Sequence, residues 1–205
     1  MDQRVLTVLR SGGEFGPQHV RAMQRQVAKW APRARFSCLS DVEVPGVECI
    51  PLRHDWPGWY AKIELFRLGE SFLFTDLDNV ILGPIDHLFV GRYTTQRGGW
   101  NALMYVVPDR AVYDVFAADP AGHIARNQPT GINGKAFGDA GFVRRMRRGE
   151  CWEDVTPGSV VNIAELLRPF PYRWSRPPPE TRVLLCAGKR RPWNTAEFRD
   201  LYEEK

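Results

Sequence analysis

A largely apolar run that ends in two aspartates constrains this chain more than any other feature. Residues 71–75 (SFLFT) are typical of a strand buried on both faces of a sheet, and Asp76 and Asp78 follow at once. Two carboxylates two positions apart on an extended backbone point to the same side, so both reach one cation. Open α/β sheets bind ligands at the carboxyl ends of their strands, and carboxylates favour Mg²⁺ or Mn²⁺. A D-x-D triplet alone is a weak signal, and the alternative is an Asp-rich turn that ends the strand.

Strand and helix signals alternate along the chain, which indicates an α/β sheet with parallel strands and ligand loops at one edge. Residues 5–9 and 35–39 are predicted strands, and residues 19–30 between them carry apolar residues on one helical stripe. Further strands are expected at 48–50, 71–75, 80–82, 101–107 and 183–186, and helices at 61–68, 111–118, 142–148 and 196–202. The stretch 120–138 is rich in Gly, Pro and Asn and is predicted to be a long loop.

Length and composition favour one soluble domain over residues 1–205. The 205 residues are 43% hydrophobic and 25% charged, close to a globular average. The first residues contain no long apolar stretch, and no segment approaches the roughly 20 apolar residues that cross a bilayer. We therefore expect a cytoplasmic protein without a transmembrane segment. The four cysteines show no C-x-x-C spacing, which argues against a zinc knuckle or a redox pair.

The charge balance suits an anionic ligand and leaves its nature open. The formal net charge is +4, which fits a nucleotide diphosphate and also permits nucleic acid. A cluster of arginines at 144, 145, 147 and 148 is either a solvated helix face or a contact for acceptor phosphates. In the second case Arg33, Arg35, Arg190 and Arg191 would extend it.

Four segments in the same order resemble glycosyltransferases related to family eight, the glycogenin-like group of bacteria and phages. Residues 74–84 (FTDLDNVILGP) resemble the family's "YLDLDTVVVGPL", and residues 54–66 (HDWPGWYAKIELF) are similar to its "HDWPGWWSKIELF". Residues 5–13 (VLTVLRSGG) resemble its first strand and nucleotide loop, and residues 182–193 (RVLLCAGKRRPW) its "RVVCFHGxPKPW" ending. The resemblance implies a GT-A type single domain, with a Rossmann-like mixed sheet flanked by helices.

The resemblance also implies roles for individual residues. Asp76 and Asp78 match the carboxylates that bind metal and donor. Asn101 and Asp139 match positions beside the reacting sugar, and Arg191 matches the basic residue that stabilises the leaving diphosphate. The positions matched to donor binding are Leu9, Arg10, Ser11, Lys62, Asp76, Leu77, Asp78, Gly188 and Arg191. Three of these residues have a simpler structural interpretation: Lys62 as a solvated helix charge, Asp139 as a helix cap, and Asn101 as a residue of a strand-edge turn.

The sequence departs from the family at two positions. Ala187 stands where the family's "FHG" has a metal-binding His, and Ala140 replaces the Gln of its "GDQ" segment. Losing an imidazole ligand weakens a metal site unless another group replaces it. Candidates for the third ligand are His54, His87 and His123.

Three functional hypotheses follow. The first is a metal-dependent enzyme that uses Mn²⁺ or Mg²⁺ and moves a hexose from a UDP-type donor to a hydroxyl of a glycan or small molecule, with retention by the resemblance. The second is a phage-type enzyme that glycosylates a modified, hydroxymethylated base in DNA, which would have to be flipped out of the duplex. The third is a non-catalytic domain that binds a nucleotide sugar, suggested by Ala187 and Ala140. Trp59, in the aromatic loop at 54–59, is either an aromatic residue that packs within the loop or core, or a candidate for stacking on a sugar or base.

Overall fold

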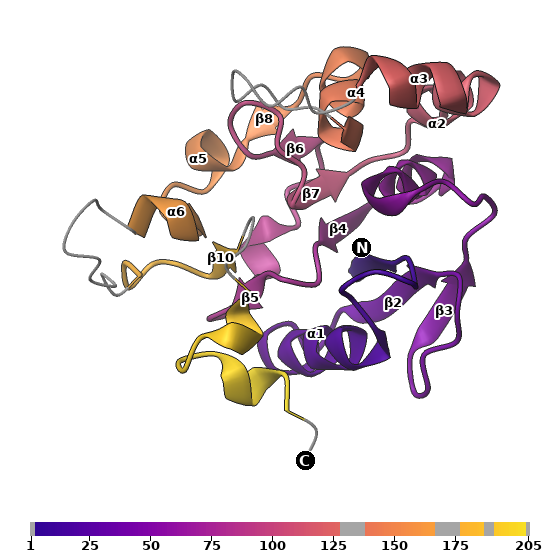
Figure 1. The fold of residues 1–205 in the computed structure, drawn as a ribbon. Helices are drawn as coiled ribbons and strands as arrows, with labels where there is room; N and C mark the ends of the chain where they lie inside the picture. Colours follow the sequence, from indigo (N-terminus) through magenta and orange to yellow (C-terminus); the bar gives the residue numbers. More distant parts are fainter. Residues whose placement is uncertain (1–2, 128–137, 167–176, 187–190, 204–205) are drawn as a thin grey trace.

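The structure is a computed structural model of the chain, and it describes residues 3–127, 138–166, 177–186 and 191–203. A seven-stranded mixed sheet runs through its middle in the order β3-β2-β1-β4-β7-β6-β8. Helix α1 covers one face of this sheet, and α2 and α4 lie on the other side (Figure 1). The predicted α/β class and mixed sheet flanked by helices are confirmed. Within the described residues, no helix has the length and apolar character needed to cross a membrane.

The strands of the large sheet are β1 (Arg4–Leu9), β2 (Arg35–Ser40), β3 (Glu48–Pro51), β4 (Phe72–Thr75), β6 (Thr94–Thr95), β7 (Leu103–Val106) and β8 (Glu150–Cys151). Strands β1 to β4 are parallel, and α1 (Pro17–Trp30) is the crossover that carries the chain from β1 back to the start of β2. Strand β7 is antiparallel to β4, with Leu103 opposite Thr75. The beginning of β7 therefore lies beside the end of β4, at the same edge of the sheet.

Strand β4 is buried on both faces, as its apolar run predicts. The side chain of Leu73 packs in the core with Val20 and Met23 of α1. Phe72 and Phe74 point the other way, into the core beneath the helices on the second face. This alternation follows from the period of two in a strand, and it fixes the register of the central strand because a slip by one residue would exchange the two faces.

A smaller sheet and the C-terminal segment complete the site edge of the molecule. Strand β10 (Val183–Leu185) pairs antiparallel with β5 (Val80–Ile81) and parallel with β9 (Val160–Asn162). The C-terminal 3₁₀ turns η3 (Pro192–Asn194) and η4 (Arg199–Leu201) lie beside α1 (Figure 1). The structure thus brings the end of the chain back to the segment that follows β4.

Several elements differ from the sequence-based expectation. The helix expected at 61–68 is the 3₁₀ helix η1 (Gly58–Arg67), and the helix expected at 196–202 is shortened to η4. Part of the loop expected at 120–138 is helix α3 (Pro120–Arg126), because Oδ1 of Asp119 accepts the Gly122 N–H and Pro120 opens the first turn. Residues 128–137 of that stretch lie outside the described residues.

Helices α2 and α4 start at a polar N-cap and at a glycine, respectively. Helix α2 (Arg110–Ala118) is capped by Asp109, whose side chain accepts the Ala111 N–H. Helix α4 (Gly138–Met146) begins four residues earlier than expected and ends before Arg147. Short elements complete the chain: η2 (Asp86–Leu88), α5 (Trp152–Val155) and α6 (Ile163–Leu166).

Candidate functional site

Asp76 and Asp78 lie in a tight turn directly after β4. The Asp76 N–H donates to the Ala102 carbonyl (2.8 Å), and the Asn79 N–H donates back to the Asp76 carbonyl (3.3 Å). Both aspartates are therefore past the end of the strand, so the extended backbone expected for this pair is wrong. A turn of the chain, rather than the pleat of a strand, sets the direction of the two carboxylates.

Two residues outside the D-x-D triplet hold this turn. Nδ2 of Asn79, which is fully buried, donates to Oγ1 of Thr75 (3.0 Å) and to the Ala102 carbonyl (2.7 Å). The hydroxyl of Tyr202 lies 3.3 Å from the Leu77 carbonyl and 3.1 Å from the Asn79 carbonyl, so its single proton can be shared between these two acceptors. The turn is thus fixed from β7 on one side and from the C-terminal segment on the other.

Lys62 of η1 forms an ion pair with Asp76. Its Nζ lies 2.7 Å from Oδ1 and 2.8 Å from Oδ2, and its side chain keeps 14% of its exposure, so it is not the solvated surface charge of the simpler interpretation. Burial raises the pKa of Asp76 to about 7; Lys62 opposes this rise and Asp78 adds to it. Burial alone would lower the pKa of Lys62, but its carboxylate neighbours raise it, so the lysine stays charged.

Arg191 connects Asp78 with Glu14. Its guanidinium forms an ion pair with Asp78, and Nε and Nη2 donate to the Glu14 carboxylate at 2.7–3.0 Å. Burial raises the pKa of Asp78 and Arg191 opposes that rise, whereas the hydrogen bonds from Arg191 lower the pKa of the exposed Glu14. The structure therefore places Arg191 beside the D-x-D turn, where the resemblance expects a cation.

Asn101 and Asp139 form a second buried pair next to the turn. Nδ2 of Asn101 donates to Oδ2 of Asp139 at 2.5 Å, and the two residues are 5% and 4% exposed. Asn101 is positioned by β7, which begins two residues after it. Asp139 is positioned by α4, because it lies in the first turn of that helix. Burial raises the pKa of Asp139, while Lys62 and the bond from Asn101 lower it. Lys62 thus acts electrostatically on both carboxylate groups, so the two pairs belong to one site.

The predicted nucleotide loop follows β1 at the same edge of the sheet. The side chain of Leu9 is fully buried in the core, so only its backbone faces the loop. The N–H of Ser11 donates to Asp41 at 2.8 Å, its hydroxyl donates at 2.6 Å, and Arg10 Nη1 donates at 2.7 Å. Burial would raise the pKa of Asp41, but the Ser11 bonds hold it below its usual value. Arg10 also forms an ion pair with Asp55.

Negative charge exceeds positive charge among these contacts. Lys62 and Arg191 face a larger set of carboxylates, which are those of Glu14, Asp76, Asp78 and Asp139. Burial is the first cause of the raised pKa of Asp76, Asp78 and Asp139, and neighbouring carboxylates add to the rise at Asp76 and Asp78. This donor set fits a hard divalent cation, which commonly binds one or two protein carboxylates and completes its shell with phosphates and water.

The structure places the three candidate histidines against other partners. The rings of His54 and His87 lie 2.6 Å from the Tyr113 hydroxyl and 3.0 Å from Ser159 Oγ, and His123 lies 3.1 Å from the Val115 carbonyl. In the described part of the chain, no group of three or more His, Cys, Asp or Glu side chains is arranged to hold a metal. Ala187 and Gly188 lie outside the described residues.

Three arginines of the cluster at 144–148, in α4 and just after it, form contacts that hold this helix against the rest of the protein. Arg144 donates to the Gly98 carbonyl (3.0 Å) and Arg145 donates to Asn127. Arg147 donates to the Val107 carbonyl (3.1 Å) and pairs with Asp109 (2.9 Å). These contacts favour a structural role over a phosphate-binding face for these three arginines.

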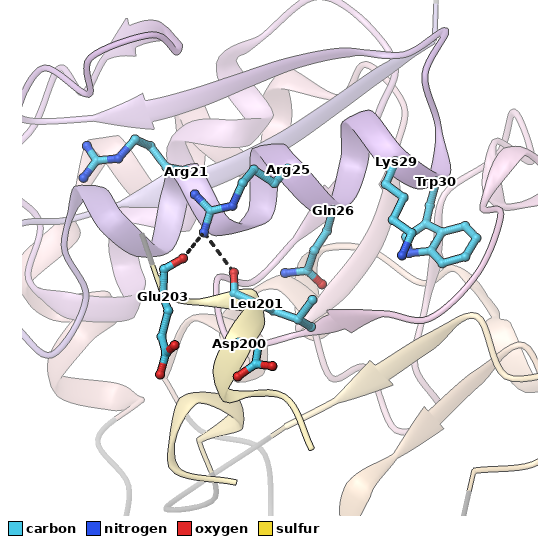
Figure 2. A pocket seen from close by; sticks show the side chains of 8 residues that line it. All are labelled: Arg21, Arg25, Gln26, Lys29, Trp30, Asp200, Leu201 and Glu203. Atoms are coloured by element: carbon cyan, nitrogen blue, oxygen red, sulfur yellow. Dashed lines mark hydrogen bonds between the residues drawn. The ribbon is translucent and has the colours of Figure 1, made fainter. Parts of the chain in front are cut away.

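A cavity of about 500 Å³ lies away from this site, between α1 and the C-terminal segment (Figure 2). Its walls combine basic side chains of α1 with acidic residues of the tail, and Arg25 donates to the carbonyls of Leu201 (3.0 Å) and Glu203 (3.3 Å). The lining residues are Arg21, Arg25, Gln26, Lys29, Trp30, Asp200, Leu201 and Glu203. None of them is a predicted site residue, so we place the candidate site at the edge of the sheet.

Comparison of the structure with solved structures identifies the fold. Two structures of the glycosyltransferase GlyE from Streptococcus pneumoniae TIGR4 superpose on the whole chain with TM-scores of 0.63 and 0.65, at 9% identity. An active-site mutant of LgtC matches 97% of the chain with a TM-score of 0.61 and 10% identity, over 95% of its own length. The chain has the GT-A glycosyltransferase fold.

The chain spans 61% of the length of the GlyE structures that it matches. No protein-family model matches the sequence, and no match was found among curated proteins. The relationship to GlyE and LgtC is therefore one of shared fold, and the activity of this chain is argued below from its own residues.

Several residues of the site were missed by reasoning from the sequence. Asn79 directly follows the D-x-D triplet, and its amide is the kind of group that fastens a turn, so its position was a usable signal. Asp41 follows β2 at the ligand edge of the sheet, which was a second signal. Glu14 and Tyr202 had none, because each reaches the site from a segment remote in sequence from its partners.

Proposed function

We propose that this chain transfers a hexose from a nucleotide-diphosphate sugar, probed first with UDP-sugars, to a hydroxyl group of an acceptor. The observation that carries the proposal is the meeting of two ion pairs, Lys62–Asp76 and Arg191–Asp78, at the carboxyl end of the central strand. Open α/β sheets bind ligands at this edge. The fold shared with GlyE and LgtC supports the same class of reaction. On the basis of the sequence resemblance, we also propose that the configuration at the transferred carbon is retained.

The charges of the site suit a diphosphate that arrives with Mg²⁺ or Mn²⁺. Asp76 and Asp78 would hold the ion, and the ion would supply positive charge to the leaving diphosphate. Lys62 lies against Asp76 and keeps its charge, so it contributes a fixed cation beside the donor. A nucleotide base and ribose would lie over the loop of Arg10 and Ser11, which Asp41 holds in place.

Arg191 is the residue that we assign to the leaving group. A guanidinium presents paired donors that match phosphate oxygens, and its charge acts on the negative charge that develops as the sugar departs. Two of its nitrogens bind Glu14, whose carboxylate is half exposed. A diphosphate would replace this carboxylate on Arg191.

Asn101 and Asp139 are assigned to the sugar. Both are buried beside the turn that contains Asp76 and Asp78, and their short hydrogen bond fixes the direction of each side chain. An amide and a carboxylate together offer donors and acceptors to sugar hydroxyls near the reacting carbon. In this arrangement they orient the sugar while Arg191 and the cations carry the diphosphate.

The test is turnover by the purified chain. UDP release is measured with UDP-glucose, UDP-galactose and UDP-N-acetylglucosamine in the presence of Mn²⁺, and UDP binding is measured by calorimetry with and without the ion. We expect ion-dependent UDP binding and slow donor hydrolysis even without an acceptor. Asp114→Asn, which changes an exposed pair on α2, serves as the control variant and should match the wild type. Absence of both binding and turnover with every donor would reject the proposal.

Two observations favour a second candidate function, a domain that binds a nucleotide sugar without transferring it. The described residues hold no group of three protein ligands for a metal, and Ala140 stands where the resembling family has Gln. A domain that binds nucleotide sugar without transferring it would give tight UDP binding with no release of UDP from any donor. The DNA-modifying alternative is less well supported, because Arg144, Arg145 and Arg147 are bound within the protein.

A further inference from the structure

The cavity between α1 and the C-terminal segment has a charge distribution that the donor site does not explain. Its volume of about 500 Å³ lies within the range of roughly 300–1,000 Å³ that is typical of small-molecule sites. Three basic side chains of α1 and two acidic ones of the C-terminal segment line it, so positive charge prevails. The basic residues are Arg21, Arg25 and Lys29, which recur every fourth position and therefore share one face of the helix.

Arg25 and Lys29 bring positive charge to this cavity without a carboxylate partner. Arg25 donates to the carbonyls of Leu201 (3.0 Å) and Glu203 (3.3 Å), and Lys29 Nζ lies 4.6 Å from the centroid of the ring of Trp30. Within the described residues, no ion pair joins either cation to a carboxylate. Figure 2 shows the carboxylate of Glu203 directed away from the Arg25 guanidinium. A neutral carbonyl is a weaker partner for a guanidinium than a charged oxygen, so an anion can replace these carbonyls.

The cavity also offers surface to the uncharged part of a ligand. Trp30 and Leu201, both partly buried, supply apolar wall. Gln26 supplies a buried amide, which is held in place because its Oε1 accepts the Ile81 N–H at 2.9 Å. An inorganic ion would fill only part of this volume. A phosphorylated molecule of the size of a sugar would contact the cations and the apolar wall together.

Tyr202 connects this cavity with the D-x-D turn. The two carbonyls that Arg25 binds belong to the neighbours of Tyr202 in the chain. The Tyr202 hydroxyl contacts two carbonyls of the turn, and a hydrogen bond with Gln26 opposes the rise that burial causes in its pKa. A ligand that takes Arg25 away from the C-terminal segment therefore loosens the support that Tyr202 gives to the turn.

We propose that this cavity is a second ligand site, which binds a small phosphate ester and thereby weakens binding of the donor. The binding itself is independent of the proposed function, whereas its effect on the donor rests on that function. The phosphate binds Arg25 and Lys29, and the organic part packs on Trp30 and Leu201. Because such coupling is reciprocal, UDP in turn weakens binding of the ester by the same factor.

The experiment first measures binding to the cavity alone. Calorimetry at low ionic strength, without UDP and with EDTA, follows the binding of glucose 6-phosphate and of inorganic phosphate to the whole chain. The variants are Arg25→Gln and Lys29→Gln, and the second keeps the test valid if the first unsettles the C-terminal segment. Arg110→Gln, which removes an exposed cation from α2, is the matched control. Arg191→Gln reports whether the probe occupies the donor site instead.

We expect glucose 6-phosphate to bind the wild type more tightly than inorganic phosphate does. Arg25→Gln and Lys29→Gln should each weaken its binding by about fivefold or more, because each removes a charge-assisted contact. Arg110→Gln and Arg191→Gln should stay within about twofold of the wild type, because neither cation lines the cavity. Absence of binding, equal affinity for the two probes, unchanged affinity in Lys29→Gln, or loss of binding in Arg191→Gln would each overturn the inference.

The coupling is measured afterwards, as UDP affinity in the presence of Mn²⁺ with and without glucose 6-phosphate. We expect the ester to lower UDP affinity by about threefold or more in the wild type and to have little effect in Tyr202→Phe, which still binds the ester. UDP affinity that is the same with and without bound ester overturns the coupling. A wild type that binds the ester but not UDP rejects the proposed function and leaves the second site in place.

Discussion

The ammonium of Lys62 lies 2.7 Å from Oδ1 and 2.8 Å from Oδ2 of Asp76, in a part of the molecule where both side chains are largely shielded from water. The pair joins η1 to the turn after β4, and its lysine also acts on Asp78 and Asp139. Lys62 is therefore a positive charge that all three aspartates share, whereas Arg191 acts chiefly on Asp78. Removing one partner of such a pair leaves the other charge without compensation.

Lys62→Met should destabilise the chain by about 3 kcal/mol, because it leaves the aspartates next to one another without their central cation. Urea denaturation at pH 7 measures the change, and lower pH should restore stability as Asp76 takes up a proton. Lys29→Met is the control, since Lys29 lies over the Trp30 ring on the surface of α1. Equal stability of Lys62→Met and Lys29→Met would contradict the role given to the buried pair.

The contribution of Asp76 to the stability of the chain without metal should fall between about pH 4 and pH 7 as this carboxyl group ionises. The folded-state pKa of Asp76 is raised to about 7, above its unfolded value of roughly 3.9, so the folded form binds the proton more tightly. This contribution is complete below the unfolded pKa and is lost as pH rises through the folded pKa, with a slope of at most about 1.4 kcal/mol per pH unit for one group.

Urea unfolding at several pH values measures this effect. Asp76→Asn should flatten the slope, and Mn²⁺ with UDP should restore stability at pH 7. An equal pH dependence of stability in the wild type and in Asp76→Asn would show that ionisation of Asp76 does not oppose folding in this way.

Glu14→Gln should tighten UDP binding by about three- to tenfold, because a neutral amide competes less with a diphosphate for Arg191 than a carboxylate does. Calorimetry with Mn²⁺ measures the affinity. The free energy of unfolding should change by less than about 1 kcal/mol, since Glu14 is half exposed. Asp154→Asn removes a comparable exposed partner from Arg97 and is the control. Weaker UDP binding in Glu14→Gln would instead mean that Glu14 positions Arg191 for the donor.

Asp139→Asn should lower the rate of sugar transfer by about a hundredfold while UDP affinity stays unchanged, because the carboxylate is assigned to the sugar and not to the diphosphate. Steady-state kinetics and UDP calorimetry separate the two effects. Asn101→Ala should act in the same direction, and the double variant should add little, since each residue orients the other. A matching loss of UDP affinity would place Asp139 at the diphosphate instead.

Tyr202→Phe should cost about 1 kcal/mol of stability and weaken Mn²⁺-dependent UDP binding, because its hydroxyl holds the carbonyls of the D-x-D turn. Tyr113→Phe removes a hydroxyl that contacts His54, and it controls for the loss of one buried hydrogen bond. If both variants bind UDP like the wild type, the C-terminal segment supports only the fold.

The sequence by itself determined the elements whose signal is local. The apolar run 71–75 became the central strand, and the stripe of Val20, Met23 and Val27 became the buried face of α1, because periodicity directly reports which side chains avoid water. Where local signals competed, as in 120–126, the capping of a helix by Asp119 prevailed over the glycine and proline content. The position of the aspartates after a buried strand likewise followed from the chain alone.

Only the tertiary structure decided which charges meet. Lys62 reaches Asp76 across 14 residues, Asn101 reaches Asp139 across 38, and Arg191 reaches Asp78 across 113, and none of these separations has a periodic signature. These charged and polar side chains come together because β7 pairs antiparallel with β4 and because the C-terminal segment packs beside the turn after β4. Pairing of this kind depends on how strands cross and where helices begin, which is set by the packing of the whole chain and not by any one segment.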